Sequence, residues 1–130
     1  MKIMVCYTGS QSSRQALELA IQHAKIFTAK IFLVASMKKG TAGELEELAR
    51  IEEAHQEAIE KVKQEGIDCE TRLLVRGFTP DEDLVHFANE EDVDEIVIGI
   101  RKRSKVGKRI FGSTAQHVIL NAHCPVVTVK

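Results

Sequence analysis

The chain of 130 residues contains no tryptophan and one tyrosine, so it lacks the aromatic platform on which single-stranded nucleic acids stack. It has no apolar run of membrane-spanning length, and its apolar start is too soon interrupted for a signal peptide. Its formal net charge of -1 argues against a protein that binds nucleic acid through charge alone. We therefore expect a globular cytoplasmic protein that binds neither nucleic acid nor membranes.

Cysteine is also scarce. Cys6, Cys69 and Cys124 are odd in number, far apart in the sequence and without a C-x-x-C spacing, so we expect buried free thiols in a reducing compartment. His117 and His123 lie near Cys124, but no carboxylate falls at a ligand spacing. The sequence therefore predicts no metal site built from side chains.

Apolar segments of strand length alternate with segments of helical periodicity along the whole chain. The strand-like segments are residues 2–6, 31–35, 71–75, 95–100 and 125–129, and the helical ones are residues 13–27 and 44–64, a segment that starts at Pro80, and "STAQHVILNA". A βαβαβαβαβ order predicts an α/β fold with one parallel sheet and helices on both faces. We find no long linker and no internal repeat, residues 37–44 being the one loose connection, and we expect a single domain over residues 1–130.

Two of the predicted helices begin at capping signals. In "TPDE", Thr79 suits the N-cap, Pro80 the first helical position, and Glu82 completes a capping box. Ser113 and Gln116 have the same spacing at the last helix. The sequence therefore predicts helix N-termini at positions 79 and 113.

The strongest candidate for a binding site is "GIRKRSKVGKRIFGST", residues 99–114, between the fourth strand and the last helix. It contains three glycines, and six of the nine residues 101–109 are Lys or Arg. Cations, glycines and a helix N-terminus together favour a polyphosphate ligand. The segment matches neither G-x-x-x-x-G-K-[ST] nor G-x-G-x-x-G, and a solvated basic loop before an ordinary helix cap is the alternative interpretation.

A second candidate is "YTGSQSS", residues 7–13, between the first strand and the first helix. Its glycine and hydroxyls would suit a phosphate, and the stretch is similar to the FMN phosphate loop of flavodoxins and, more faintly, to the loop of PP-loop ATP pyrophosphatases. Neither similarity accounts for the basic segment, and the aromatic residues that sandwich a flavin are missing. We interpret the stretch as a wall of the site, with Ser12 and Gln15 capping the first helix.

Over nearly its whole length the chain resembles the universal stress protein family. The resemblance is carried by the "GS" after the first strand, "RGFTPDEDLVHFA", "DEIVIG", "CPVVTVK" and the nucleotide signature G-x2-G-x9-G-[ST], which falls on Gly99, Gly112 and Ser113. Position 102 is Lys rather than the second glycine, and Thr8 stands where an acid is often found.

The resemblance implies a Rossmann-like fold, similar to that of adenine nucleotide alpha hydrolases, with strand order 3-2-1-4-5. It implies a stress-response or signalling module that binds ATP, together with Mg²⁺, between strands 1 and 4 with little or no hydrolysis. It also implies a homodimer through the last strand, Pro125 to Val129. By position, the residues that it places beside the phosphates and ribose are Gly99, Lys102, Gly112, Ser113 and Thr114, and those near the base and sugar are Tyr7, Thr8, Ser36 and Ile98.

Two alternatives stay open. One is a dimeric member of the same family that binds no nucleotide and acts through protein interactions. The other, more remote, is a flavodoxin-like FMN binder.

Overall fold

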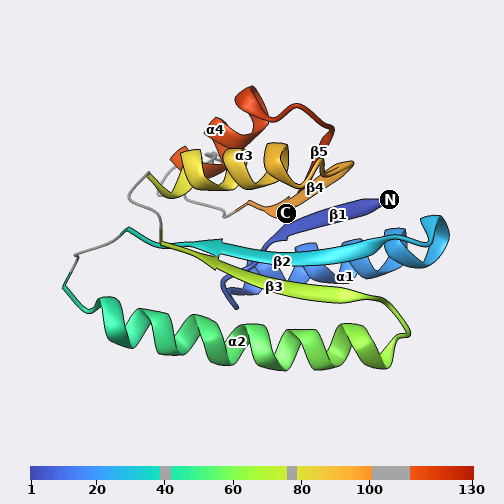
Figure 1. The fold of residues 1–130 in the computed structure, drawn as a ribbon, viewed down its shortest axis with the longest axis horizontal. Coiled ribbons are helices and arrows are strands. Elements are labelled where there is room, and N and C mark those ends of the chain that lie inside the picture. The colour runs from blue at the N-terminus through green and yellow to red at the C-terminus, as the bar shows by residue number, and fades with distance from the viewer. Residues whose placement is uncertain (39–41, 76–78, 101–111) are drawn as a thin grey trace.

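The computed structural model describes residues 1–38, 42–75, 79–100 and 112–130. Within these residues nine elements follow one another in strict alternation (Figure 1): β1 (Lys2–Cys6), α1 (Gln11–Phe27), β2 (Lys30–Ser36), α2 (Glu44–Gln64), β3 (Cys69–Leu74), α3 (Pro80–Glu90), β4 (Glu95–Gly99), α4 (Ser113–Asn121) and β5 (Val126–Val129). Among the described residues, no helix is both long and apolar enough to span a lipid bilayer.

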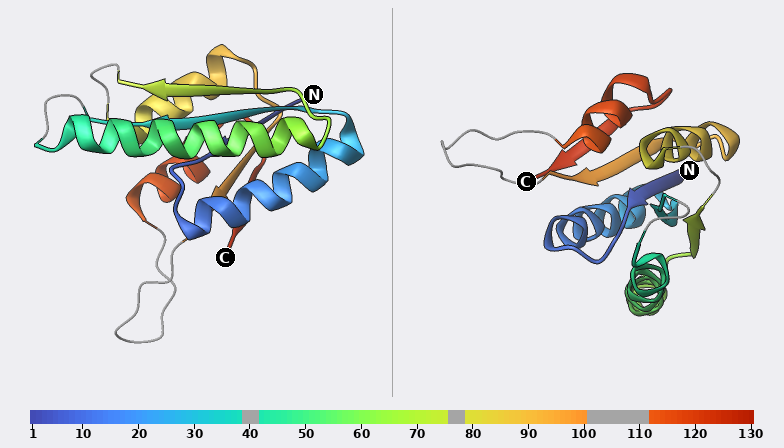
Figure 2. Two further views of the ribbon diagram at one scale, coloured as in Figure 1. Left: turned by 90° about the horizontal axis from the view of Figure 1, so that it is seen from below. Right: turned by 90° about the vertical axis from the view of Figure 1, so that its left-hand side faces the viewer.

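The strands form one sheet in the order β3-β2-β1-β4-β5, and every neighbouring pair is parallel. Helices α1 and α2 cover one face of the sheet, and α3 and α4 cover the other (Figures 1 and 2). The predicted fold class and strand order are therefore confirmed. β3 and β5 are the edge strands, and the order reverses between β1 and β4.

Alternating strand residues supply the two halves of the core. Met4, Phe32 and Ile96 pack with Phe87 of α3 and Val118 of α4. The neighbouring strand residues point to the other face, where they pack with α1 and α2; they are Ile3, Val5, Ile31, Leu33 and Val97. Each fully buried side chain of this size contributes about 1.5–3 kcal/mol to folding, so burial on both faces fixes the register of the sheet.

Two helix starts differ from the prediction. α1 begins after Ser10, not Ser12: Ser10 is extended (φ -66°, ψ 161°) and its Oγ accepts from the Ser13 N–H. α4 begins after Gly112, because Gly112 is extended and Ser113 already lies in the helix. In both cases the sequence offers several residues able to cap, and the residue whose backbone is extended before the first helical residue, Ser10 or Gly112, is the one used. At α3 the predicted cap is confirmed, since Thr79 Oγ1 accepts from the Glu82 N–H at 3.4 Å.

Candidate functional site

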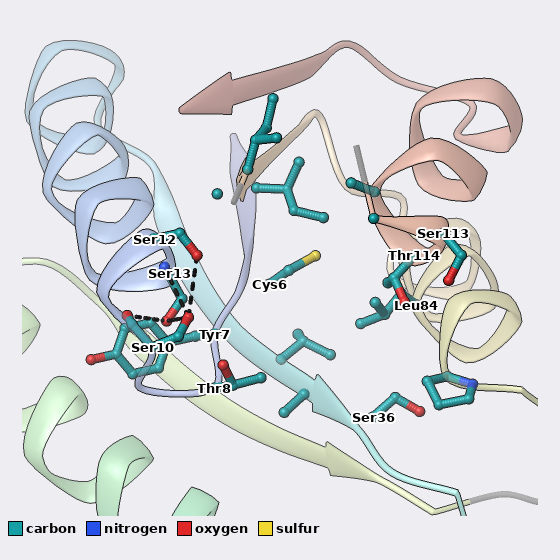
Figure 3. A pocket seen from close by; sticks show the side chains of 18 residues that line it. Cys6, Tyr7, Thr8, Ser10, Ser12, Ser13, Ser36, Leu84, Ser113 and Thr114 are labelled. Atoms are coloured by element: carbon teal, nitrogen blue, oxygen red, sulfur yellow. Dashed lines mark hydrogen bonds between the residues drawn. The ribbon is translucent and has the colours of Figure 1, made fainter. Parts of the chain in front are cut away.

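A cavity of about 330 Å³ opens at the carboxyl ends of β1, β2 and β4. In parallel α/β sheets ligands bind at this edge, where the strand order reverses. The ends of these strands and the first turns of α1, α3 and α4 line the cavity. In Figure 3, Ser10, Ser12 and Ser13 lie on one side and Ser113 and Thr114 on the other, with Cys6 and Thr8 between them.

Three serine hydroxyls hold the first turn of α1. Ser13 is buried, and its Oγ donates to the Ser10 carbonyl (2.9 Å) and accepts from the Gly9 N–H (3.1 Å). Ser10 Oγ lies 3.3 Å from Ser12 Oγ and accepts from the Ser13 N–H. This network fixes the turn, so the N-terminus of α1 lies at the cavity in a defined position.

Gly99, at the end of β4, is in close contact with the backbone of α1. A Cβ at this position would lie 2.3 Å from the Ser12 carbonyl oxygen, far inside van der Waals contact. Gly9 shows a related need for glycine: its φ is +88°, and a Cβ would lie 2.8 Å from Ala54 Cβ. Because Gly99 and Gly9 have no side chains, α1 and α2 can approach the strand ends. Gly99 therefore has a packing role that the nucleotide signature alone did not predict.

The first turn of α4 forms the opposite wall. Its N-cap is Gly112, which has no side chain to accept from the first N–H groups, so these donors need another partner. The positive ends of the α1 and α4 dipoles therefore border the same cavity. This arrangement favours an anion, above all one with several oxygen acceptors.

The remaining wall is formed by β2 and α3. Val34, Ala35 and Leu84 give it apolar surface, and Ile98 of β4 adjoins them in the cavity lining. Ser36, the last residue of β2, donates its hydroxyl proton to Asp83 Oδ2 at 2.9 Å, and Asp83 is completely buried. An apolar wall with one polar contact suits a flat heterocycle rather than a second charged group.

The cavity brings together eight of the nine residues predicted for the site. These are Tyr7, Thr8, Ser36, Ile98, Gly99, Gly112, Ser113 and Thr114. Lys102 lies outside the described residues. That the eight contact a ligand stays a prediction.

Tyr7 lines the cavity, but most of its side chain lies in the core. Its side chain is only 5 % exposed and belongs to the core between α1 and α2. The ring lies 6.0 Å from the His55 ring, centroid to centroid, and the Tyr7 carbonyl accepts from His55 Nε2 at 2.8 Å. Burial raises the pKa of Tyr7 and lowers that of His55. The aromatic ring is therefore part of the core and is not placed to stack on a ligand in the cavity.

Sequence reasoning missed the contributions of α3 and of the strand interiors. Pro80 and Leu84 line the cavity because the strand order places the first turn of α3 beside the end of β2, which no local motif reveals. Cys6 also lines it, but burial raises the pKa of the Cys6 thiol to about 12, so the thiol is not activated.

The histidines near the C-terminus pair separately with acids. His117 Nδ1 lies 3.8 Å from Asp81 Oδ2, and His123 Nε2 lies 3.8 Å from Asp92 Oδ1. Within residues 1–38, 42–75, 79–100 and 112–130, no three histidine, cysteine or acidic side chains gather into a set that would hold a metal ion.

Known proteins share both the sequence and the fold. The family model of the universal stress protein family matches residues 1–130. A universal stress protein of Methanocaldococcus jannaschii is 33% identical, over 99% of this chain and 81% of its own length. A universal stress protein structure from Archaeoglobus fulgidus is 37% identical with a TM-score of 0.89, covering 99% and 97% of the two chains. Another from the same organism, in complex with dAMP, is 33% identical with a TM-score of 0.81, covering 99% and 96%. The chain therefore belongs to the universal stress protein family.

Proposed function

We propose that this protein is a stress-response or signalling module that binds an adenine nucleotide, ATP in the cell, in the cavity between β1 and β4. The observation that carries the proposal is that two helix N-termini, those of α1 and α4, border one cavity whose third wall is apolar. Phosphates need N–H donors and positive potential, whereas a base needs apolar surface and few polar contacts. In this cavity the helix N-termini and the apolar surface lie on different walls.

Each of the predicted site residues then has a role in binding the nucleotide. The phosphates and ribose contact Gly99, Gly112, Ser113 and Thr114, with Lys102 as an additional cation. The base and sugar contact Thr8, Ser36 and Ile98, and Tyr7 contributes backbone. The relative from Archaeoglobus fulgidus in complex with dAMP supports an adenine ligand, since it is 33% identical over almost the whole chain.

Efficient hydrolysis is not part of the proposal. No histidine or carboxylate is among the described residues that line the cavity, so they provide no general base for an attacking water. The described lining residues also include no carboxylate that could bind a metal ion. Mg²⁺ would therefore enter bound to the phosphate oxygens, and hydroxyl groups and water would complete its coordination.

We also propose a cytoplasmic homodimer of this single domain, formed through β5. β5 is an edge strand, so one row of its backbone N–H and C=O groups has no neighbour in the sheet. Its four residues are half-buried, and Ile119 and Leu120 of α4 are exposed large apolar residues. A second copy paired along this edge would cover both.

Two measurements test the nucleotide proposal. The protein is purified without added ligand and denatured, and the released small molecules are identified by absorbance and mass. Adenine nucleotide supports the proposal, flavin would replace it by an FMN-binding function, and no ligand leaves the decision to the second measurement. That measurement is calorimetric titration with ATP, ADP and AMP, with and without Mg²⁺.

Ser113→Ala is the sharpest variant for the titration. We expect it to weaken binding about 10- to 150-fold, the range for one lost hydrogen bond to a charged group. Gln116→Ala is the matched control, because Gln116 is exposed on the next turn of α4 and is absent from the cavity lining. If the parent binds no adenine nucleotide at millimolar concentration, the interaction-only alternative replaces the proposal.

A further inference from the structure

The apolar wall of the cavity contains a buried carboxylate that the binding of phosphates does not explain. Asp83 lies in the first turn of α3 and is 0 % exposed. Its Oδ2 accepts from Ser36, but Oδ1 is buried and has no hydrogen-bond partner among the described residues. Such an oxygen destabilises the fold relative to an apolar residue, so Asp83 requires a reason other than stability.

The effect of Asp83 is to fix the direction of the Ser36 hydroxyl. A serine hydroxyl has one proton and two lone pairs. Among the residues that the structure describes, Ser36 Oγ has two neighbours and both are acceptors: Asp83 Oδ2 at 2.9 Å and the Leu74 carbonyl at 3.4 Å. The proton is therefore used inside the protein, and Ser36, which lines the cavity, has only lone pairs left to offer a ligand.

Figure 3 shows Ser36 extending from the end of β2 toward the first turn of α3, on the side of the cavity away from the serines of α1. The other lining residues of β2 and α3 are apolar. A base held on this wall meets Ser36 as its polar contact there, and that contact accepts but does not donate.

We propose that the Ser36–Asp83 pair makes the cavity selective for a purine that carries an amino group at C6, with Ser36 as the contact and Asp83 as its positioning residue. This inference rests on the proposed function, in which the base lies near β2. The C6 amine of adenine donates to Ser36. The C6 carbonyl of hypoxanthine or guanine would instead set two acceptors against each other, and a site with a fixed buried acceptor rejects such an analogue.

The experiment is a titration of the full chain with three nucleotides: AMP, IMP and purine riboside 5′-monophosphate, which has only hydrogen at C6. For the parent we expect AMP to bind at least about tenfold more tightly than IMP, and about three- to tenfold more tightly than the purine nucleotide. The variants are Asp83→Ala, Ser36→Ala and the double variant. Asp81→Ala is the control, since it removes an acid from the same turn that has no hydrogen bond to Ser36.

Asp83→Ala leaves the Ser36 hydroxyl with the more distant Leu74 carbonyl, at 3.4 Å, as its acceptor in the protein, so the hydroxyl can turn and donate to a ligand. IMP affinity should therefore rise several-fold while the preference for AMP over the purine nucleotide persists. Ser36→Ala should abolish that preference by weakening AMP. In the double variant both ratios should equal those of Ser36→Ala, because Asp83 acts through Ser36. A purely structural role of Asp83 would change all three affinities by one factor.

Different failures have different meanings. If the parent binds no AMP, the proposed function falls and the selectivity with it. If the parent binds AMP and IMP equally, or if Ser36→Ala leaves the ratio to the purine nucleotide unchanged, the selectivity is overturned and nucleotide binding stands. The Ser36→Ala result decides the question even if Asp83→Ala fails to fold.

Discussion

Gly99→Ala tests whether β4 and α1 approach each other closely only because residue 99 has no side chain. The new Cβ would lie 2.3 Å from the Ser12 oxygen, 2.4 Å from its carbonyl carbon and 2.8 Å from its Cβ, where ordinary contacts begin at 3.4 Å. Two of these atoms are backbone, so no rotamer change relieves the overlap. The end of β4 and the first turn of α1 must separate by about 1 Å, a repacking of the kind that overfilled cores require.

The magnitude follows from that separation. Overpacking typically destabilises by about 1–3 kcal/mol, and contact with backbone places this site at about 2–3 kcal/mol. For a domain of this size we expect the Tm to fall by roughly 6–15 °C. Urea unfolding followed by circular dichroism measures the free energy, and thermal unfolding measures the Tm.

Gly112→Ser is the matched control for Gly99→Ala. Gly112 also borders the cavity, but it has φ -63°, and no atom of the described part of the chain lies within 4 Å of an added Cβ. Serine is also a better N-cap than glycine by a few tenths of a kcal/mol, roughly, so the control should be as stable as the parent or slightly more. If Gly99→Ala unfolds within about 0.5 kcal/mol of the parent, the close approach does not require glycine and the reasoning is refuted.

Three further predictions concern other parts of the molecule. Burial lowers the pKa of His55, so on acidification the unfolded chain binds a proton at this residue more readily than the native chain does. The free energy of unfolding should therefore fall as the pH decreases from about 7 to 5, and it should fall less in His55→Gln. Burial raises the pKa of Cys6 and Cys69 to about 12, so iodoacetamide at pH 8 should alkylate neither thiol in the native protein, as mass spectrometry would show. Thr128→Pro should dissociate the proposed dimer in size-exclusion chromatography with light scattering while circular dichroism shows a folded monomer.

The proline variant follows from the register of β5. The Ile96 N–H donates to the Pro125 carbonyl at 3.0 Å, and the Ile100 N–H donates to the Val129 carbonyl at 2.7 Å. Because backbone groups alternate along a strand, the Thr128 N–H faces the open edge, where proline is tolerated within one chain but cannot donate to a second copy. Thr128→Val keeps that N–H and is the control. A proline variant that remains dimeric would place the interface elsewhere.

The predictions on His55 and on the two cysteines can each be contradicted by one result. The His55 argument fails if His55→Gln and the parent lose stability in parallel between pH 7 and pH 5. The argument from burial fails if Cys6 or Cys69 is alkylated in the native protein as fast as in urea.

The alternation of apolar and helical segments was enough to predict the parallel sheet, and the family resemblance supplied the order in which the strands lie. Periodicity predicts elements, whereas their order depends on contacts between distant segments. The same limit explains Tyr7. Its position directly after β1 placed it correctly at the cavity, but the direction of its ring depends on α2, which enters the fold almost fifty residues later and brings His55 against it.

Asp83 was missed although the sequence contains a signal for it. In "TPDEDLVHFANE" three acids follow in the first helical turn after Thr79, and acids in that position are usually explained by the helix dipole. Asp83 precedes Phe87 by one turn, however, and Asp83, Leu84, Phe87 and Ala88 form the buried face of α3. A charged residue at the phase of the apolar stripe is a departure from amphipathic patterning. Its hydrogen-bond partner, Ser36, lies on β2, and only folding brings the two residues together.

The stability of the fold and the proposed binding site depend on the same contact. α1 starts against Gly99, and the first turns of α1 and α4 both border the cavity, so a ligand that touches both binds only while α1 stays against β4. On the proposed function, nucleotide at a hundred times its Kd would stabilise the native state by about 2.7 kcal/mol, close to the loss expected for Gly99→Ala. Saturating AMP should therefore return that variant to nearly the parent's unliganded Tm if its cavity persists. A variant whose cavity has collapsed gains nothing from the ligand, so unfolding curves recorded with and without AMP separate lost packing from a lost site.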